Sequence, residues 1–150
     1  MTSTDRSVRQ PGLVAEADRH ARGLVDTSVV VDMERIPATL LPRELAVSAI
    51  TMAELAAGPH AATNADERAR RQDRLQRAEA AFDPLPFDGA SARAYGRIYA
   101  AVIDAGRKAR GARAVDLLIA ATALAASIPL YTRNANNFQS IRDLVEVVAV

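Results

Sequence analysis

Three acidic residues draw attention because the residues around them are mostly apolar. Asp26 follows the apolar pair Leu24-Val25 and precedes two hydroxyl residues and three valines. Glu54 lies shortly after a second apolar stretch, and Asp116 is the only acid in a long apolar run. Carboxylates that meet in a fold raise one another's pKa values unless a cation neutralises them. If these three meet, they favour the binding of a divalent metal ion.

Composition narrows the kind of metal. The chain has no cysteine, which excludes disulfides, thiol catalysis and thiolate metal sites. Its two histidines, His20 and His60, lie in different polar contexts and do not suggest a histidine site. Oxygen ligands remain, and they suit Mg²⁺ or Mn²⁺. The net charge of +1 is not that of a strong polyanion binder.

Magnesium in proteins keeps several waters and is commonly bound by one or two carboxylates together with substrate phosphates. A carboxylate cluster without histidine or cysteine therefore indicates metal-dependent hydrolysis of a phosphodiester. An ion at this site would polarise the scissile phosphate and lower the pKa of the attacking water, and a second ion would stabilise the leaving oxygen.

The elements that position these residues follow from hydrophobic periodicity and from Gly and Pro punctuation. We expect strands at 23–26, 45–50, 128–132 and 144–150, with a short edge strand at 84–87. We expect a helix that starts after Thr27-Ser28, either of which can cap it. We expect further helices from Thr51 to Gly58-Pro59, over 62–82, from Asp88 or Ser91 to about Gly106, and over 113–126. This alternation predicts an α/β fold with a parallel sheet covered by helices on both faces.

Parallel strands end at one edge of such a sheet. That edge receives Asp26 from the first strand, Glu54 one turn into the following helix, and Asn134 and Asn137 after strand 128–132. Asp116, expected in the first turn of its helix, joins them only if the start of that helix faces the same edge. Periodicity does not decide this orientation.

Each residue also has a structural interpretation. Asp26 is a possible turn or N-cap residue, and Glu54 forms the pattern of a capping box with Thr51. Asp116 would cost several kcal/mol if buried unpaired, and Arg113 is an available partner. The nearby polar residues are also common loop formers or backbone hydrogen-bonding groups, namely Ser28, Thr132, Asn134 and Asn137.

Residues 1–21 read as a polar extension and residues 22–150 as a single domain. We expect a short helix near 13–22 within the extension. No apolar run approaches the ~20 residues of a membrane span, and the N-terminal residues contain no apolar signal core. We therefore expect a cytoplasmic protein that does not contact a membrane.

Four stretches together resemble the PIN-domain family, in particular the VapC-type toxins of bacterial toxin–antitoxin pairs. They are Leu24-Val25-Asp26-Thr27-Ser28, residues 48–55 with Gly58, residues 116–123, and residues 132–138. The resemblance extends from about residue 22 to the end of the chain. It implies a three-layer α/β/α fold with a four- to five-stranded parallel sheet. It also implies Mg²⁺- or Mn²⁺-dependent RNA cleavage, homodimerisation and inhibition by a VapB-type antitoxin.

By this resemblance Asp26, Glu54 and Asp116 match the acidic metal ligands and catalytic residues of the family. Ser28 and Thr132 match its supporting polar positions. The chain departs from the family pattern just before the phenylalanine, where an acid is usual and Asn137 stands instead. An amide hydrogen-bonds but supplies no charge, so we expect a second metal to be held weakly or only with substrate phosphate present.

Further candidate residues lie at the same edge of the sheet and on the arginine-rich surface. Asn134 is a second amide that could contribute an oxygen to the site. Arg133 and the arginines of 68–77 are candidates for contact with the RNA backbone, although those of 68–77 also suit a solvated helix surface.

Two other functions remain open. The first is a PIN-like module that binds RNA or protein and cleaves weakly or not at all, and Asn137 is its main support. The second is a phosphoryl-transfer enzyme with Asp26 as nucleophile. Such enzymes often carry a second Asp two residues on, where this chain has Ser28.

Overall fold

The computed structural model describes residues 19–150. The predicted polar extension and its short helix lie mostly outside these residues. Residues 19–21 run beside the segment that leads into the second strand. Arg19 Nε donates to the Leu41 carbonyl at 3.0 Å, and the Arg43 amide donates to the His20 carbonyl at 3.0 Å. These last residues before the first strand therefore pack on the fold.

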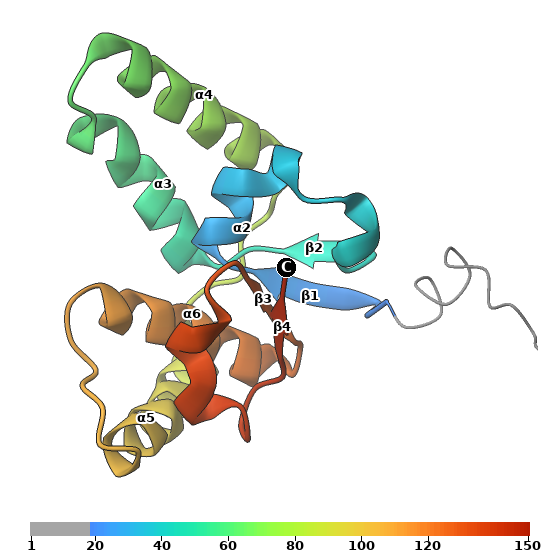
Figure 1. The fold of residues 1–150 in the computed structure, drawn as a ribbon, viewed down its shortest axis with the longest axis vertical. Coiled ribbons are helices and arrows are strands. Elements are labelled where there is room, and N and C mark those ends of the chain that lie inside the picture. The colour runs from blue at the N-terminus through green and yellow to red at the C-terminus, as the bar shows by residue number, and fades with distance from the viewer. Residues whose placement is uncertain (1–18) are drawn as a thin grey trace, which may run out of the picture.

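Within the described residues, parallel strands form one sheet in the order β2-β1-β3-β4 (Figure 1). The strands are β1 Arg22–Val25, β2 Glu44–Ala46, β3 Leu130–Thr132 and β4 Val147–Ala149. Every pair is parallel, which confirms the predicted sheet. The edge strand expected at 84–87 is wrong, because Leu85 makes only an isolated bridge to Ser48. Pro84 and Pro86 flank Leu85 and have no N–H to extend a ladder.

Helices connect the strands and cover both faces of the sheet. They are α2 Thr27–Asp32, α3 Ala49–Ala61, α4 Ala65–Ala81, α5 Gly89–Asp104 and α6 Ala112–Ala126, with 3₁₀ turns η1 Met33–Arg35, η2 Ala38–Leu40 and η3 Ala135–Ile141. The α3–α4 hairpin extends away from the sheet (Figure 1). Arg71 of α4 pairs with Glu67 and donates to the Gly58 carbonyl of α3 at 2.9 Å, so it fastens the two helices together.

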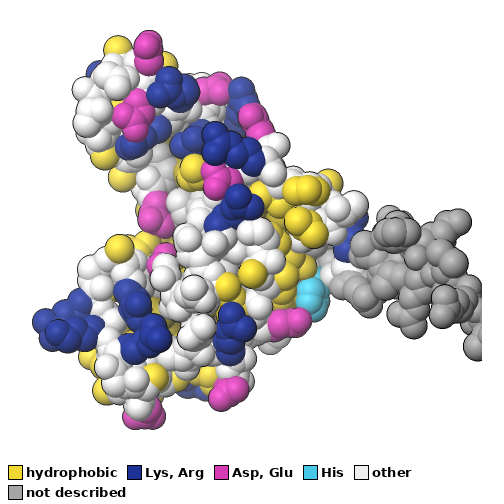
Figure 2. Space-filling model, in the orientation of Figure 1, with side chains coloured by type: hydrophobic (Ala, Val, Ile, Leu, Met, Phe, Trp, Pro, Cys, Tyr) yellow, Lys and Arg dark blue, Asp and Glu magenta, His cyan; other side chains and the backbone are white. Residues whose placement is uncertain are grey.

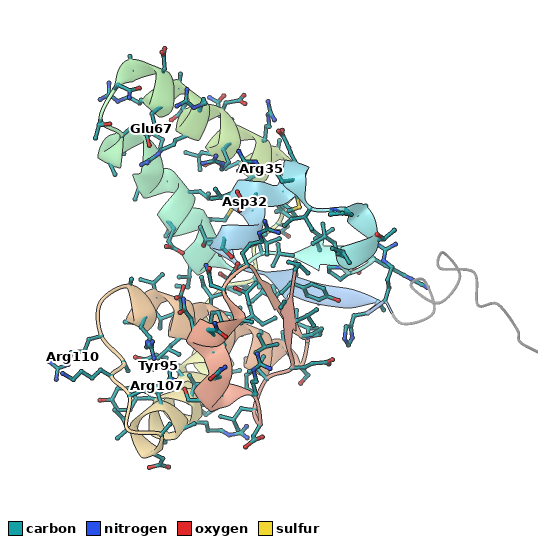
Figure 3. The ribbon with its side chains drawn as sticks, in the orientation of Figure 1. Asp32, Arg35, Glu67, Tyr95, Arg107 and Arg110 are labelled. Atoms are coloured by element: carbon teal, nitrogen blue, oxygen red, sulfur yellow. The ribbon has the colours of Figure 1, made fainter. Side chains whose placement is uncertain are left out.

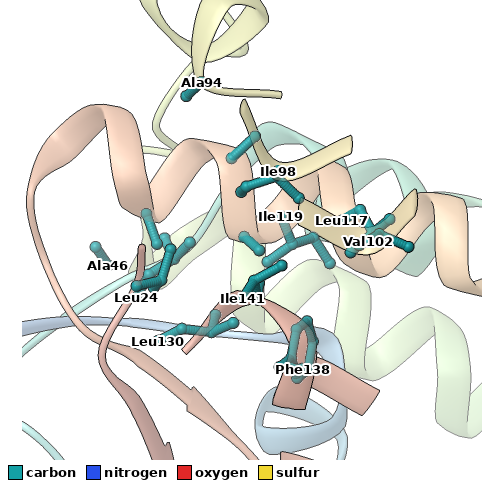
Figure 4. Packing of buried hydrophobic residues seen from close by; sticks show 14 residues of the cluster. Leu24, Ala46, Ala94, Ile98, Val102, Leu117, Ile119, Leu130, Phe138 and Ile141 are labelled. Atoms are coloured by element: carbon teal, nitrogen blue, oxygen red, sulfur yellow. The ribbon is translucent and has the colours of Figure 1, made fainter. Parts of the chain in front are cut away.

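The side chains of each strand alternate between two separate cores, as a pleated strand requires. Leu24 and Leu130 face a core built with α5, α6 and η3, part of which is drawn in Figure 4. Their neighbours Val25 and Tyr131 face a second core built with α2, α3 and α4. The sheet is thus the middle layer of an α/β/α fold, as predicted.

Both helices that begin beside the acidic residues start earlier than predicted. Asp26 is the N-cap of α2, so capping by Thr27 or Ser28 is wrong. Ser48 is the N-cap of α3, where its extended backbone lets Oγ accept from the Thr51 amide at 3.0 Å. Thr51 is therefore inside the helix, and the capping box with Glu54 is also wrong.

The end predicted for α3 at Gly58-Pro59 is wrong as well, because the helix continues to Ala61. Pro59 lies in the last turn, where its missing N–H removes one hydrogen bond and need not break the helix. The donation from Arg71 to the Gly58 carbonyl supports this last turn from the neighbouring helix.

The buried face of α5 is narrower than its apolar spacing predicts. Ile98 and Val102 are fully buried against α6, whereas Tyr99 and Ile103 are each 47% exposed. Among residues 19–150, no helix combines the length and the apolar character needed to cross a bilayer.

Candidate active site

Asp26 lies where β1 ends, and the residue is only 3% exposed. Its Oδ1 accepts hydrogen bonds from the Ser28 hydroxyl at 2.5 Å and from the Val29 amide at 3.1 Å. Its own amide donates to the Tyr131 carbonyl of β3 at 3.0 Å. The N-cap role and the functional role predicted from sequence are therefore compatible, because the cap fixes the orientation of the carboxylate.

Glu54 is an exposed residue in the second turn of α3. The Thr27 hydroxyl, on α2, donates to Glu54 Oε1 at 2.6 Å and lies 3.1 Å from the Thr51 hydroxyl. Thr27 immediately follows Asp26, so one short segment positions both acids. Sequence reasoning did not single out Thr27 or Thr51 for this role.

Asp116 is partly buried and lies in the second turn of α6, because that helix begins at Ala112. The first-turn placement predicted from sequence is therefore wrong. Burial, followed by the negative charges of Asp26 and Glu54, raises the pKa of Asp116 to about 6. The Arg113 charge lowers this pKa but does not outweigh the other effects. The start of α6 thus brings Asp116 into the electrostatic range of both other acids.

Asn137, which departs from the pattern of the family that the sequence resembles, is a neighbour of Asp116. Its side chain hydrogen-bonds to the Asp116 carboxylate, which lowers the pKa of that group. The structure therefore brings Asn137 to the acidic residues as an uncharged hydrogen-bonding partner. Asn134 differs, because its recorded hydrogen bond is made by the backbone, not by the amide side chain.

Ser28 and Thr132 hold the chain that leaves β3. Ser28 Oγ accepts from the Arg133 amide at 3.0 Å, and Thr132 Oγ1 accepts from the Asn134 amide at 3.0 Å. The Arg133 side chain points to a further acid, since its Nε lies 3.4 Å from Asp32 Oδ2.

Asp32 was also absent from the predicted site, although it follows Ser28 by four residues. That spacing places the two on one face of α2. Asp32 is labelled in Figure 3 next to Arg35, which lies 4.0 Å from its other carboxylate oxygen.

The acidic residues suit an ion that keeps much of its water. Across residues 19–150, no three acidic or histidine side chains approach closely enough to coordinate one ion together. Magnesium commonly takes only one or two protein carboxylates and keeps several waters, which fits this looser arrangement. Figure 2 shows acidic side chains at the hollow between the α3–α4 hairpin and the α5–α6 side.

Residues 23–144 match the PIN domain family. The chain belongs to the PIN domain family. The PIN-domain chain is also 34% identical over 117 residues to Ribonuclease VapC5 of Mycobacterium tuberculosis, and the match covers 76% of this chain and 84% of that protein. The family resemblance inferred from the four motifs is confirmed.

Two solved structures share the fold. The M. tuberculosis VapBC-5 structure, a member of the VapBC family of toxin–antitoxin systems, aligns with a TM-score of 0.74 and 32% identity, covering 87% of this chain and 99% of that one. FitAcB from Neisseria gonorrhoeae aligns with a TM-score of 0.62 and 28% identity, covering 83% and 94%.

Proposed function

We propose that this PIN-domain chain is a VapC-type toxin, an endoribonuclease that uses Mg²⁺ or Mn²⁺ to cleave RNA phosphodiester bonds. The observation that carries the proposal is the convergence of Asp26, Glu54 and Asp116, because the charges of the first two acids add to burial in raising the pKa of Asp116. Mutual repulsion of this kind is relieved when a cation binds. The name of the relative Ribonuclease VapC5 supports RNA as the substrate.

Asp26 and Asp116 would hold the ion, with Glu54 beside them. When bound, the ion supplies a Lewis acid for the phosphate and lowers the pKa of the attacking water. The protein contributes orientation: Ser28 and the Val29 amide fix Asp26, and the Thr27 hydroxyl fixes Glu54. Such preorganised groups lose little freedom at the moment of reaction.

Asn137 limits the charge at this site. It places an amide beside Asp116 where the family commonly has an acid, so three carboxylates are available instead of four. A second ion would then depend on the negative charge of the substrate phosphate. Asn134 and Thr132 lie at the same edge, where we propose a supporting role in holding the loop after β3.

The proposed inhibitor is a VapB-type antitoxin, in line with the VapBC complexes among the structural relatives. A separate groove of about 580 Å³ lies between α2, β2 and α4. Its lining is mostly apolar, with several arginines among its charged residues: Val30, Val31, Met33, Glu34, Leu45, Arg70, Asp73, Arg74, Arg77, Ala78, Ala81 and Phe82. We propose that a segment of the antitoxin binds there, because a groove of this size and character suits an amphipathic helix.

We further propose that the toxin is a cytoplasmic homodimer formed by the domain of residues 22–150. The exposed pair Tyr99 and Ile103 on α5 supports self-association. Analytical ultracentrifugation and cell fractionation test these two properties separately from catalysis.

The decisive experiment is RNA cleavage by the purified full chain with Mg²⁺, with Mn²⁺ and with EDTA. Asp26→Asn keeps an N-cap residue of equal quality, and Asp116→Asn removes a repelled charge. Both variants should therefore fold while losing at least about 100-fold of the activity, the scale on which single catalytic groups act. Full cleavage by either variant, or cleavage unaffected by EDTA, would contradict the proposal.

The same assay separates cleavage from a binding-only function. Asn137 favours this second candidate, because it places an uncharged amide beside Asp116 where the family commonly has an acid. RNA binding without cleavage at every metal concentration would establish the binding module and exclude the nuclease.

A further inference from the structure

A basic loop joins α5 to α6, and both of its ends have defined backbone geometry. At the end of α5, Gly106 has φ +72°, its amide donates to the Ile103 carbonyl at 2.9 Å, and the Arg107 amide donates to the Val102 carbonyl at 3.0 Å. This pair of bonds is a Schellman motif. At the other end Gly111 has φ +64° and is the N-cap of α6. The loop is therefore held at both helix ends.

The cations of this loop are directed outward. Arg107, Lys108 and Arg110 are exposed, whereas Ala109 between them packs against the core that contains α5 and α6. Figure 3 shows Arg110 at the outer margin of the loop. No acid interrupts residues 105–115. The result is a concentrated positive charge at the end of α5, next to the exposed side chain of Ile103.

The loop cations lack the ion pairs that other arginines of the chain make. In the described part of the structure, no salt bridge or side-chain hydrogen bond is recorded for Arg107, Lys108 or Arg110. By contrast, Arg77 of α4 pairs with Asp73 at 2.8 Å and with Glu34 at 3.0 Å. Arginines that are already paired with acids contribute little to binding an anion. The loop is therefore a better contact for an anion than the paired arginine of α4.

The loop leads directly to the candidate active site. Arg113 lies one helical turn before Asp116 on α6 and acts on it electrostatically. Arg110 is six residues from Asp116, so the chain between them spans at most ~20 Å. A polyanion cleaved beside Asp116 would therefore reach the loop within a few nucleotides.

We propose that Arg107, Lys108 and Arg110, continued by Arg113, bind the phosphodiester backbone of single-stranded RNA next to the scissile bond. The inference rests on the proposed ribonuclease function and adds the surface that holds the substrate. Closely spaced unpaired cations are typical of phosphodiester-backbone binding, whereas the core of a protein interface is depleted of charge. Arginine is also well suited to phosphate because its guanidinium presents several donors.

The test measures binding of a 20-nucleotide mixed-sequence single-stranded RNA by fluorescence anisotropy at several salt concentrations. All proteins carry Asp26→Asn, so that the RNA stays intact. The variant Arg107→Gln, Lys108→Gln, Arg110→Gln should bind the RNA about tenfold more weakly. The slope of log Kd against the logarithm of the salt concentration should also be shallower by about 2, because each lost phosphate contact changes this slope by ~0.7. Replacing the two arginines with lysine should preserve most of the affinity.

A charge-matched control removes three cations elsewhere: Arg22→Gln, Arg43→Gln, Arg142→Gln. Arg22 begins β1, Arg43 directly precedes β2 and Arg142 precedes β4, so all three belong to the amino-terminal edge of the sheet, opposite the edge that carries Asp26. The control should bind RNA nearly as tightly as the parent. Equal losses in the two triple variants, or unchanged binding by the loop variant, would overturn the proposal, as would a loss confined to antitoxin binding.

Cleavage by the chain with native Asp26 is measured in parallel. If that chain cleaves RNA while the loop variant binds normally, the loop proposal fails and the ribonuclease function stands. If that chain neither binds nor cleaves RNA with Mg²⁺ or Mn²⁺, the proposed function fails and this inference fails with it.

Discussion

The Thr27 hydroxyl donates to the Glu54 carboxylate at 2.6 Å, which links the first turn of α2 to the second turn of α3. Thr27 directly follows Asp26, and α3 begins after a different strand. One hydrogen bond therefore fixes the relative positions of two acids that the chain delivers from separate elements. Glu54 is exposed, so without this bond its side chain would have several rotamers available.

Thr27→Val should weaken RNA cleavage by about tenfold, because a lost hydrogen bond to a charged group is worth roughly 1.5 kcal/mol or more. Thr27→Ser keeps the hydroxyl and should retain most of the activity. Because Thr27 acts through Glu54, the change should also raise the Mg²⁺ concentration needed for half-maximal cleavage. Kinetics over a range of Mg²⁺ concentrations measures both effects. Equal activity of the Val and Ser variants would contradict this positioning role.

The sequence predicts the order of the elements and the shared edge because both follow from local rules. Apolar strands alternate with helices, and parallel strands end at one edge, so Asp26 and Glu54 could be placed without coordinates. The position of Asp116 depends on how α6 packs against the sheet, and periodicity holds no information on that packing. The exact helix starts depend on which of several nearby polar residues becomes the cap, as Ser48 rather than Thr51 and Asp26 rather than Thr27 illustrate.

The pH dependence of stability in the metal-free protein follows from Asp116. Its pKa is raised from 3.8 to about 6, so between these values the folded protein binds more protons than the unfolded chain. Stability should therefore fall as the pH rises from about 4 to about 6. Allowing for solvent screening of a partly exposed group, the loss is about 1–2 kcal/mol. Thermal unfolding in EDTA across this pH range measures it.

Asp116→Asn removes this penalty, so the variant should unfold at a higher temperature than the parent at pH 7 in EDTA. The exposed Asp143→Asn provides the control and should leave the unfolding temperature and its pH dependence nearly unchanged. A variant at position 116 that is less stable than the parent at pH 7 would show that the carboxylate is not under electrostatic stress.

Gly23 is required by the close approach of β1 to Tyr131. A Cβ at this position would lie 2.5 Å from Tyr131 Cε2 and 3.1 Å from Pro42 Cγ. Tyr131 is 3% exposed, so its ring has little room to move. Gly23→Ala should destabilise the fold by about 1–3 kcal/mol, measured by denaturant unfolding. Gly96→Ala is the matched control, since a Cβ there meets nothing within 4 Å and alanine favours a helix.

The proposed antitoxin groove is tested at Val31, which lines it and is 42% exposed. Val31→Gln replaces an apolar contact with an amide and should weaken binding of the cognate antitoxin by about tenfold, as expected when a polar group is desolvated without a partner. Leu40→Gln is the control, because Leu40 is 52% exposed and lies outside the groove lining. Calorimetric titration measures both. RNA cleavage without antitoxin should be the same in the two variants.

Asn137→Asp restores an acid at the position where this chain departs from the common family pattern. The amide of Asn137 hydrogen-bonds to Asp116, so the new carboxylate would lie beside an acid that is already repelled by two others. In EDTA the variant should be less stable than the parent. With metal the added charge should favour a second ion, so half-maximal cleavage should need several-fold less Mg²⁺.

Asn136→Asp makes the same chemical change at an exposed neighbouring residue, whose recorded side-chain contact is with Gln139 at 3.4 Å. It should alter neither the stability in EDTA nor the Mg²⁺ requirement. If Asn137→Asp left the Mg²⁺ requirement unchanged while destabilising the metal-free protein, the added carboxylate would be repelled by Asp116 without facing an ion. The interpretation of Asn137 as the residue that weakens a second metal would then be wrong, and its role would be to stabilise the ionised form of Asp116.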